Sequence, residues 1–167
     1  MKRSAYKSIL FITAFSIVAF ISACVKDRSL TIGESVPEIS AIDLNDNTVK
    51  LSDFRGKVVI LRFWASGCRA CVAEMPALDA YYKKYKEMGL VVVAVNRGDS
   101  RQRVTDFVED LKISYPVLLD PVLITQKKYG VTAVPTTYFI DRTGVLRKTV
   151  FGPVSLESIE TFVAELL

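Results

Sequence analysis

The chain has 167 residues, half of which are hydrophobic, so it is long enough for one compact domain with a core and short for two. Its formal net charge is +4, but Lys2, Arg3 and Lys7 supply three of these charges, and the nearly neutral remainder argues against nucleic acid as a partner. The sequence contains no histidine, which excludes Cys-His and Ser-His-Asp catalysis and the common zinc ligand sets.

The N-terminus has the layout of an export signal, in which a short basic stretch precedes the apolar run Ile9–Ile21. The residues that lead up to Cys24 resemble the lipobox of bacterial lipoproteins, in which this cysteine becomes the lipid-carrying N-terminus. The alternative is an uncleaved transmembrane anchor over residues 8–25, in which Cys24 is an ordinary buried thiol. Both interpretations place the rest of the chain outside the cytoplasm, attached to a bacterial membrane.

We therefore expect three regions: a lipoprotein signal peptide or membrane anchor over residues 1–24, a polar tether over 25–35, and one domain over 36–167. Near the start of the domain, apolar residues on both sides of a polar turn predict a β-hairpin over Ile39–Leu51. The β-branched and aromatic run Lys57–Trp64 then predicts a buried central strand.

Helical and strand patterns alternate along the rest of the domain. The sequence predicts helices over Cys68–Met88, with a kink at Pro76, from Asp99 or Ser100 to about Lys112, over Ile124–Tyr129 and from Ser155 to Leu167. It predicts strands over Leu90–Val95 and Val117–Leu119, and a closing hairpin over Thr137–Ile140 and Val145–Val150. This order indicates an α/β fold with a mixed central sheet flanked by helices.

Two cysteines remain once Cys24 is assigned to the lipid, and they lie close together as Cys68 and Cys71. A disulfide that closes so short a loop stabilises a fold little, so a structural staple is a poor explanation. Two thiolates without histidines or a second cysteine pair cannot complete a zinc site, so we expect no metal. The pair therefore indicates a redox-active disulfide, with no other cofactor.

The predicted placement assigns different roles to the two sulfurs. At the start of a helix that follows a strand, Cys68 lies where free N–H groups and the helix dipole favour a thiolate, so we predict that it is the attacking nucleophile. Cys71 follows one turn deeper on the same helix face and is predicted to be the resolving thiol. Arg69 adds a positive charge that should favour the thiolate further.

The segment Phe63–Cys71, together with Glu74 and Pro76, resembles the active-site segment of the TlpA/ResA-like membrane-tethered thioredoxins. The likeness covers roughly residues 32–167 and extends through the segments 92–96, 115–120 and 134–141. It implies a thioredoxin fold with an N-terminal β-hairpin and a central insertion, and an enzyme that reduces specific extracytoplasmic protein disulfides. In the best-known branch the substrate is apocytochrome c before haem attachment, and electrons come from a membrane thiol relay of the CcdA or DsbD kind.

The resemblance also assigns roles to residues outside the dithiol. Pro135 matches a cis-proline that faces the C-x-x-C and leaves the Val134 backbone free to pair with a substrate strand. Glu74 matches an acidic residue near the thiols, where a partly buried carboxylate would have a raised pKa and could exchange the proton that Cys71 loses. Trp64 is expected both in the core and at the wall of the substrate site.

One departure leaves the direction of electron flow open, because Arg69-Ala70 replaces the acidic-proline dipeptide common in the reductases of this family. A thiol oxidase on the same fold is therefore the first alternative. A peroxiredoxin-like peroxidase is the second, although Ala65 stands where a threonine is expected. A membrane-tethered binding module without catalysis is the third. For the leading function, as for these alternatives, we expect a monomer.

Overall fold

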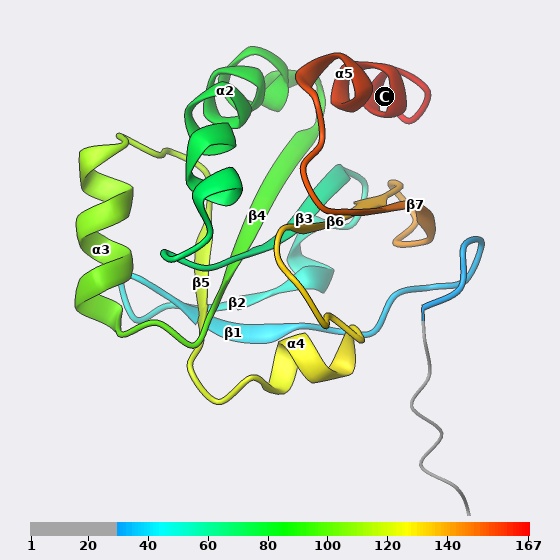
Figure 1. The fold of residues 1–167 in the computed structure, drawn as a ribbon. Helices are drawn as coiled ribbons and strands as arrows, with labels where there is room; N and C mark the ends of the chain where they lie inside the picture. Colours follow the sequence, from blue (N-terminus) through cyan, green and yellow to red (C-terminus); the bar gives the residue numbers. More distant parts are fainter. Residues whose placement is uncertain (1–29) are drawn as a thin grey trace, which may run out of the picture.

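The computed structural model of the protein describes residues 30–167 (Figure 1). The predicted signal or anchor segment, the predicted lipidation site Cys24 and the first part of the predicted tether lie outside the described residues. Over the range 30–167, none of the helices combines the length and the apolar character that a membrane span requires.

A mixed sheet of seven strands forms the centre of the domain, in the order β2-β1-β5-β4-β3-β6-β7 (Figure 1). Three neighbouring strands are parallel: β3 (Val58–Trp64), β4 (Leu90–Arg97) and β5 (Val117–Asp120). The outer strands pair antiparallel: β1 (Ser40–Asp43), β2 (Thr48–Lys50), β6 (Thr136–Ile140) and β7 (Leu146–Phe151). The mixed sheet, the N-terminal hairpin and the closing hairpin are as predicted from the sequence.

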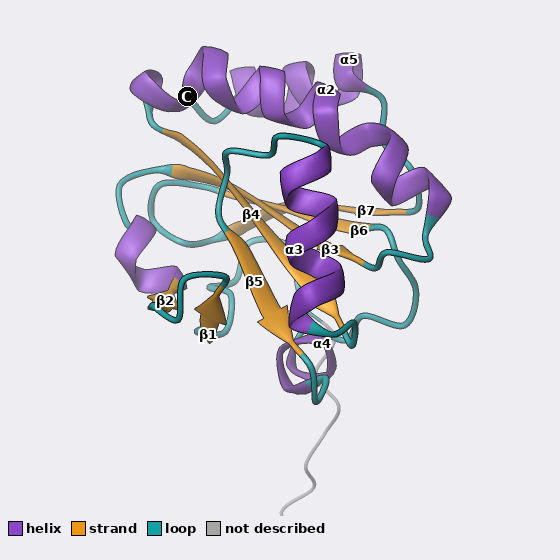
Figure 2. Ribbon diagram, turned by 90° about the vertical axis from the view of Figure 1, so that its left-hand side faces the viewer, coloured by secondary structure: helices purple, strands orange, loops and turns teal. Residues whose placement is uncertain are grey.

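Helices cover both faces of this sheet (Figure 2). One face packs against α2 (Arg69–Tyr85), α3 (Arg101–Asp110) and α5 (Leu156–Ala164). The other face is covered by the segment around α4 (Ile124–Lys128) and by the chain that precedes β1. Short 3-10 helices occupy Leu51–Phe54 and Lys86–Met88.

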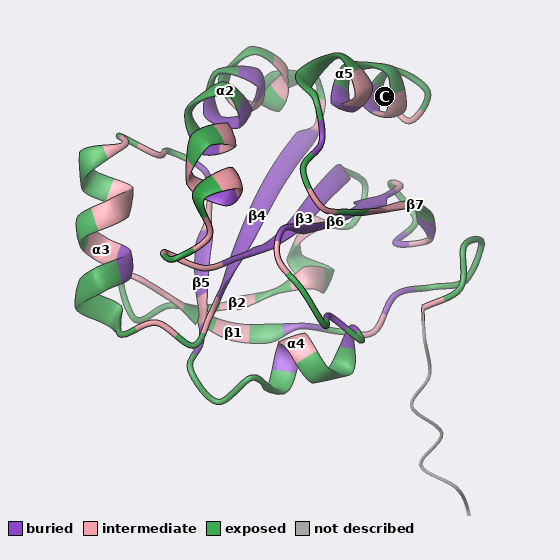
Figure 3. Cartoon of the chain, viewed as in Figure 1, coloured by how far each residue is buried: buried purple, intermediate pink, exposed green. Residues whose placement is uncertain are grey.

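The central strands are buried on both faces, which explains their continuous apolar sequence. All seven residues of β3 are buried (Figure 3). Their side chains alternate between the two layers. Ile60 and Trp64 join the cluster under α2, α3 and α5, whereas Leu61 and Phe63 join the cluster beside α4. Arg62 lies between Ile60 and Trp64 in this alternation and therefore on the α2 face.

The predicted helix 68–88 differs from the observed one at both ends. Cys68 has extended backbone angles and is the N-cap of α2, because its sulfur accepts a hydrogen bond from the Cys71 N–H. The helix continues through Pro76 to Tyr85, and the last turn tightens into the 3-10 helix that ends at Gly89. Gly89 adopts φ +97°, the left-handed conformation that ends a helix at low cost in glycine.

Candidate active site

The two cysteines lie at the junction between β3 and α2, and they form a disulfide. The S–S distance is 2.14 Å, the two Cα atoms are 5.2 Å apart, and the Cys71 N–H donates to Cys68 Sγ over 3.2 Å. Cys68 is partly exposed, whereas Cys71 is 0% exposed and packs into the core under α2. An incoming thiol or disulfide can therefore reach Cys68 and not Cys71.

A partly buried ion pair lies one helical turn beyond the dithiol. The Arg62 guanidinium on β3 pairs with the Glu74 carboxylate on α2, and their side chains are 1% and 25% exposed. Arg62 Nη1 also donates to Thr137 Oγ1 over 3.1 Å, and the Val154 N–H donates to Glu74 Oε1 over 3.2 Å. Glu74 is thus held by two neighbours, and its predicted role in proton exchange stays a prediction.

A second carboxylate anchors the turn that precedes Cys68. Asp99 accepts hydrogen bonds from the Ser66 N–H (2.7 Å), the Ser66 hydroxyl (2.9 Å) and the Asn96 amide (2.8 Å). Burial alone would raise the pKa of Asp99, but these hydrogen bonds and the charge of Arg103 outweigh it and hold the pKa below its ordinary value. The charged form of Asp99 therefore stabilises the active-site turn.

Replacing Asp99 by Asn should weaken this anchor, because an amide offers one acceptor oxygen where the carboxylate offers two. We expect the free energy of unfolding at pH 7 to fall by about 1 to 2 kcal/mol. Because the folded-state pKa of Asp99 lies below its ordinary value, this stabilisation is complete well above the ordinary pKa of an aspartate and is lost as the pH falls through the folded-state pKa. Urea unfolding at pH 7 and at pH 3 measures this.

The difference in the free energy of unfolding between wild type and Asp99→Asn should therefore be smaller at pH 3 than at pH 7. Asp110→Asn is the matched control, because it removes an exposed carboxylate at the end of α3. An Asp99→Asn effect of the same size at both pH values would show that the charge of Asp99 does not stabilise the turn.

The peptide bond between Val134 and Pro135 is cis, as the motif predicts. Phe63 pairs with Thr136, so Val134 and Pro135 lie at the same end of the sheet as Cys68. Val134 and Cys68 pack against the same hydrophobic cluster, and the Gly152 N–H donates to the Pro135 carbonyl over 2.8 Å. The role of Val134 and Pro135 in substrate binding stays a prediction.

Trp64 and Arg69 have different surroundings. The Trp64 side chain is 1% exposed and meets Phe107 edge to face, with 6.3 Å between ring centroids. Trp64 is a core residue that packs in the same cluster as Cys71. Its contact with substrate stays a prediction. Arg69 is exposed at the first position of α2, next to Cys68, and its effect on the thiolate likewise stays a prediction.

Exposed apolar side chains lie around the same end of the sheet. Val122, Leu123 and Ile124 follow the end of β5 and are 72%, 36% and 68% exposed. On the other side, Phe151 at the end of β7 is 73% exposed and pairs with Thr136, next to the cis-proline. Exposed apolar groups on both sides of a reactive sulfur suit the docking of a polypeptide.

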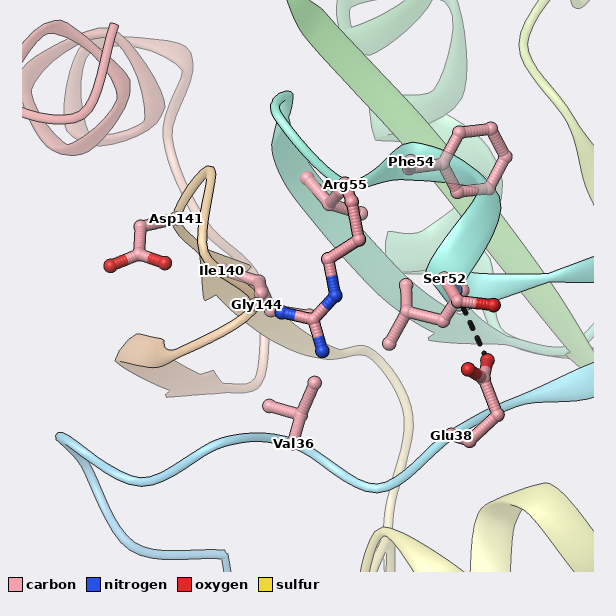
Figure 4. Close-up of a pocket in the computed structure, with 10 residues that line it drawn as sticks. Val36, Glu38, Ser52, Phe54, Arg55, Ile140, Asp141 and Gly144 are labelled. Carbon is pink, nitrogen blue, oxygen red and sulfur yellow. Dashed lines mark hydrogen bonds between the residues drawn. The ribbon is translucent and has the colours of Figure 1, made fainter.

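A separate cavity of about 140 Å³ lies at the end of β3 that is opposite to the dithiol (Figure 4). Its lining comes from the chain before β1, the 3-10 helix after β2 and the β6–β7 turn, and includes Val36, Glu38, Phe54, Arg55 and Asp141. The Ser52 N–H donates to Glu38 across it over 3.1 Å. No cysteine lines this cavity, so it is not part of the dithiol site. Among residues 30–167 there is no cluster of side chains that could hold a metal ion.

Sequence reasoning missed Arg62, Thr137 and Asp99. A signal for Arg62 was present, because a cation within a β-branched apolar run must find a partner when the strand is buried. Asp99 appeared only as a possible helix cap, but Ser100 caps α3 and Asp99 turns toward Ser66 instead.

Comparisons with known proteins agree with this geometry. Residues 32–149 match the AhpC/TSA family. A thiol-disulfide oxidoreductase ResA from Bacillus thuringiensis subsp. konkukian is 32% identical over 141 residues, which covers 84% of this chain and 82% of that one. The ResA of Oceanobacillus iheyensis is 32% identical over 165 residues, which covers 95% of this chain and 86% of that one.

Solved structures show the same relationship. The solution structure of a thiol:disulfide interchange protein from Bacteroides sp. matches with a TM-score of 0.72 and 29% identity, over 82% of this chain and 93% of that one. The thioredoxin domain of a thiol-disulfide oxidoreductase from Bacteroides vulgatus matches with a TM-score of 0.74 and 26% identity, over 82% and 98%. The predicted thioredoxin fold and enzyme class are confirmed. The chain therefore belongs to the AhpC/TSA family and is a ResA-like thiol-disulfide oxidoreductase of thioredoxin fold.

Proposed function

We propose that this enzyme reduces specific protein disulfides on the outer side of a bacterial membrane, and that apocytochrome c before haem attachment is its leading substrate. The observation that carries the proposal is the asymmetry of the dithiol, in which Cys68 is partly exposed and Cys71 is fully buried. Because of this asymmetry, Cys68 can react with a folded or extended polypeptide, and Cys71 can then resolve the mixed disulfide and release that polypeptide.

Reduction of a substrate disulfide takes place in two exchanges. The Cys68 thiolate attacks one substrate sulfur, forms a mixed disulfide and expels the other substrate sulfur as a thiolate, which takes up a proton. The Cys71 thiolate then attacks Cys68 Sγ, expels the second substrate sulfur and forms the Cys68–Cys71 disulfide. The enzyme loses two electrons and two protons in total, and the substrate gains them.

The surface around Cys68 supports a polypeptide substrate. An extended segment that lies beside Val134 would run past the cis-proline and place its own sulfur over Cys68. Phe151 on one side and the segment 122–124 on the other would cover its apolar side chains. This arrangement favours a protein disulfide over a small-molecule disulfide.

The oxidised enzyme must regain two electrons and two protons from another dithiol. We propose a membrane thiol relay of the CcdA or DsbD kind as that donor, because a reductant outside the cytoplasm needs electrons brought across the bilayer. The layout of residues 1–24 supports this location, with Cys24 as the lipid-bearing residue or with an uncleaved anchor.

Trapping substrates in cells tests the proposed function. A Cys71→Ser variant should stop after the first exchange and hold its substrate on Cys68 as a mixed disulfide. The expected trapped protein is apocytochrome c, identified by mass spectrometry after non-reducing electrophoresis. The matched control is Cys68→Ser/Cys71→Ser, which should trap nothing. Recovery of many unrelated exported proteins would contradict a specific reductase and favour the thiol oxidase alternative.

Lipidation makes a separate prediction. Wild-type protein expressed with its full N-terminus should incorporate labelled palmitate, and Cys24→Ser should lose at least about nine-tenths of the label because the lipid-bearing thiol is gone. The Cys68→Ser/Cys71→Ser variant should keep the label, which excludes acylation of the other two cysteines. Absence of label from the wild-type protein would favour the uncleaved transmembrane anchor.

A further inference from the structure

Arg62 places a permanent charge in the most buried part of the domain. It lies within β3, all of whose residues are buried, and its side chain is 1% exposed. A guanidinium does not lose its proton in proteins, so Arg62 remains a cation in every redox state of the enzyme. A buried cation is costly unless a partner compensates it, so the surroundings of Arg62 carry information about function.

The partners of Arg62 connect the dithiol helix to the cis-proline strand. Glu74 on α2 pairs with its guanidinium, and Thr137 on β6 accepts a further hydrogen bond from it. Glu74 follows Cys71 by three residues on α2, so the two side chains lie on the same helix face. Thr137 follows the cis-proline by two residues. The ion pair therefore lies between the two parts of the chain that form the site.

The resolving sulfur lies in the same layer as this pair. Strand alternation places Arg62 on the α2 face, between Ile60 and Trp64, and Cys71 belongs to the cluster on that face. Cys71 is fully buried, and charges interact strongly where water is excluded. A thiolate formed at Cys71 during reduction is therefore sensitive to the net charge of Arg62 and Glu74.

The other buried ionisable side chains on this face, Tyr81, Tyr115 and Asp79, do not compete for the role. Burial raises the pKa of Tyr81 to about 12, so this phenol is neutral at physiological pH. Burial raises the pKa of Tyr115 well above its ordinary value, although the charge of Arg62 lowers it in part, so this phenol is neutral at physiological pH. Asp79 lies further along α2, where Lys83 and Ser114 hold its carboxylate.

We propose that Arg62 is a positioning residue that sets the charge experienced by the Cys71 thiolate, because it holds Glu74 as its counter-ion one turn beyond the dithiol. With both partners present, the resolving thiolate faces a pair of net charge zero. Without Arg62 it faces a lone carboxylate, which disfavours the thiolate, and without Glu74 it faces a lone cation, which favours it. This role depends on dithiol exchange alone and not on the target or location proposed above.

The reaction of the reduced enzyme with one equivalent of 5,5′-dithiobis(2-nitrobenzoate) isolates the step concerned, when Cys24 is replaced by Ser in every variant so that Cys68 and Cys71 are the reacting thiols. Cys68 first forms a mixed disulfide with one aromatic thiol and releases the other. Cys71 then attacks Cys68 Sγ, forms the Cys68–Cys71 disulfide and releases the second aromatic thiolate. The rate of this second release depends on the Cys71 thiolate, and the second release is absent from Cys71→Ser.

The two single variants should shift this rate in opposite directions. At pH 7, Arg62→Met should slow the second release on the order of tenfold, and Glu74→Gln should accelerate it. In the pH profile, the rise in rate should move to higher pH in Arg62→Met and to lower pH in Glu74→Gln. Arg62→Lys keeps the charge and should stay close to wild type. Arg147→Met is the matched control, because it removes an arginine from an exposed ion pair with Asp141.

Three results would overturn this role for Arg62. One is an Arg62→Met enzyme that folds and shows the wild-type rate and pH profile. Another is a slower second release in Glu74→Gln, which a proton-carrying role for Glu74 predicts. If Arg62→Met alone does not fold, the comparison is between Arg62→Met/Glu74→Gln and Glu74→Gln. The second release should then be slower in the double variant than in Glu74→Gln, on the order of tenfold. Equal rates of second release in these two variants would be the third contradicting result.

Discussion

Cys68→Ser should abolish thiol-disulfide exchange, with a loss of at least about 10³-fold in rate, because it removes the sulfur that incoming disulfides can reach. Cys71 cannot substitute for it, since its side chain is 0% exposed. The rate of reduction of a model protein disulfide, measured with a dithiol donor in excess, tests this. Cys68 is the N-cap of α2, and a serine can keep that hydrogen bond, so the variant should remain folded.

Cys71→Ser is the informative comparison for this result. It should retain the first exchange, react once with one equivalent of disulfide, and stop as a mixed disulfide on Cys68. Mass spectrometry of the trapped species should place the added group on Cys68. Two results with Cys68→Ser would contradict the assignment of Cys68 as the nucleophile. One is substantial turnover by Cys68→Ser, and the other is an adduct on Cys71 in Cys68→Ser.

Local sequence patterns were sufficient to predict much of the fold. The run Lys57–Trp64 is apolar and β-branched because β3 is buried on both faces, and that signal lies within one element. The same holds for the β6–β7 hairpin, where Asp141 accepts hydrogen bonds from the Thr143 and Val145 N–H groups and so fixes the turn locally. The dithiol and the cis-proline were predictable because short motifs mark them.

The supporting contacts were not predictable from such local patterns. Arg62 and Glu74 are 12 residues apart and meet only when α2 packs on β3. Ser66 and Asp99 are 33 residues apart and meet because β3 and β4 end together, with Trp64 beside Asn96. Strand register and helix placement decide both contacts, and neither leaves a pattern in the sequence of one segment.

Because the Arg62–Glu74 contact holds α2 against β3, we expect its loss to have a large effect on the free energy of unfolding. Glu74→Ala removes the counter-ion of a guanidinium that is 1% exposed and leaves the Val154 N–H without its acceptor. Breaking a buried pair in this way costs about 3 to 5 kcal/mol. Because Glu74 itself is 25% exposed and water can reach its position, we expect a loss near the lower end of that range.

Urea unfolding of the oxidised enzyme at pH 7 measures this loss, and a double-mutant cycle assigns its cause. If the cost arises from leaving Arg62 unpaired, Arg62→Met/Glu74→Ala should be more stable than Glu74→Ala, because an apolar side chain needs no counter-ion in that layer. The expected coupling is at least about 2 kcal/mol. If the two single losses simply add, the charges do not stabilise each other, and the contribution of Glu74 to stability lies in packing along α2.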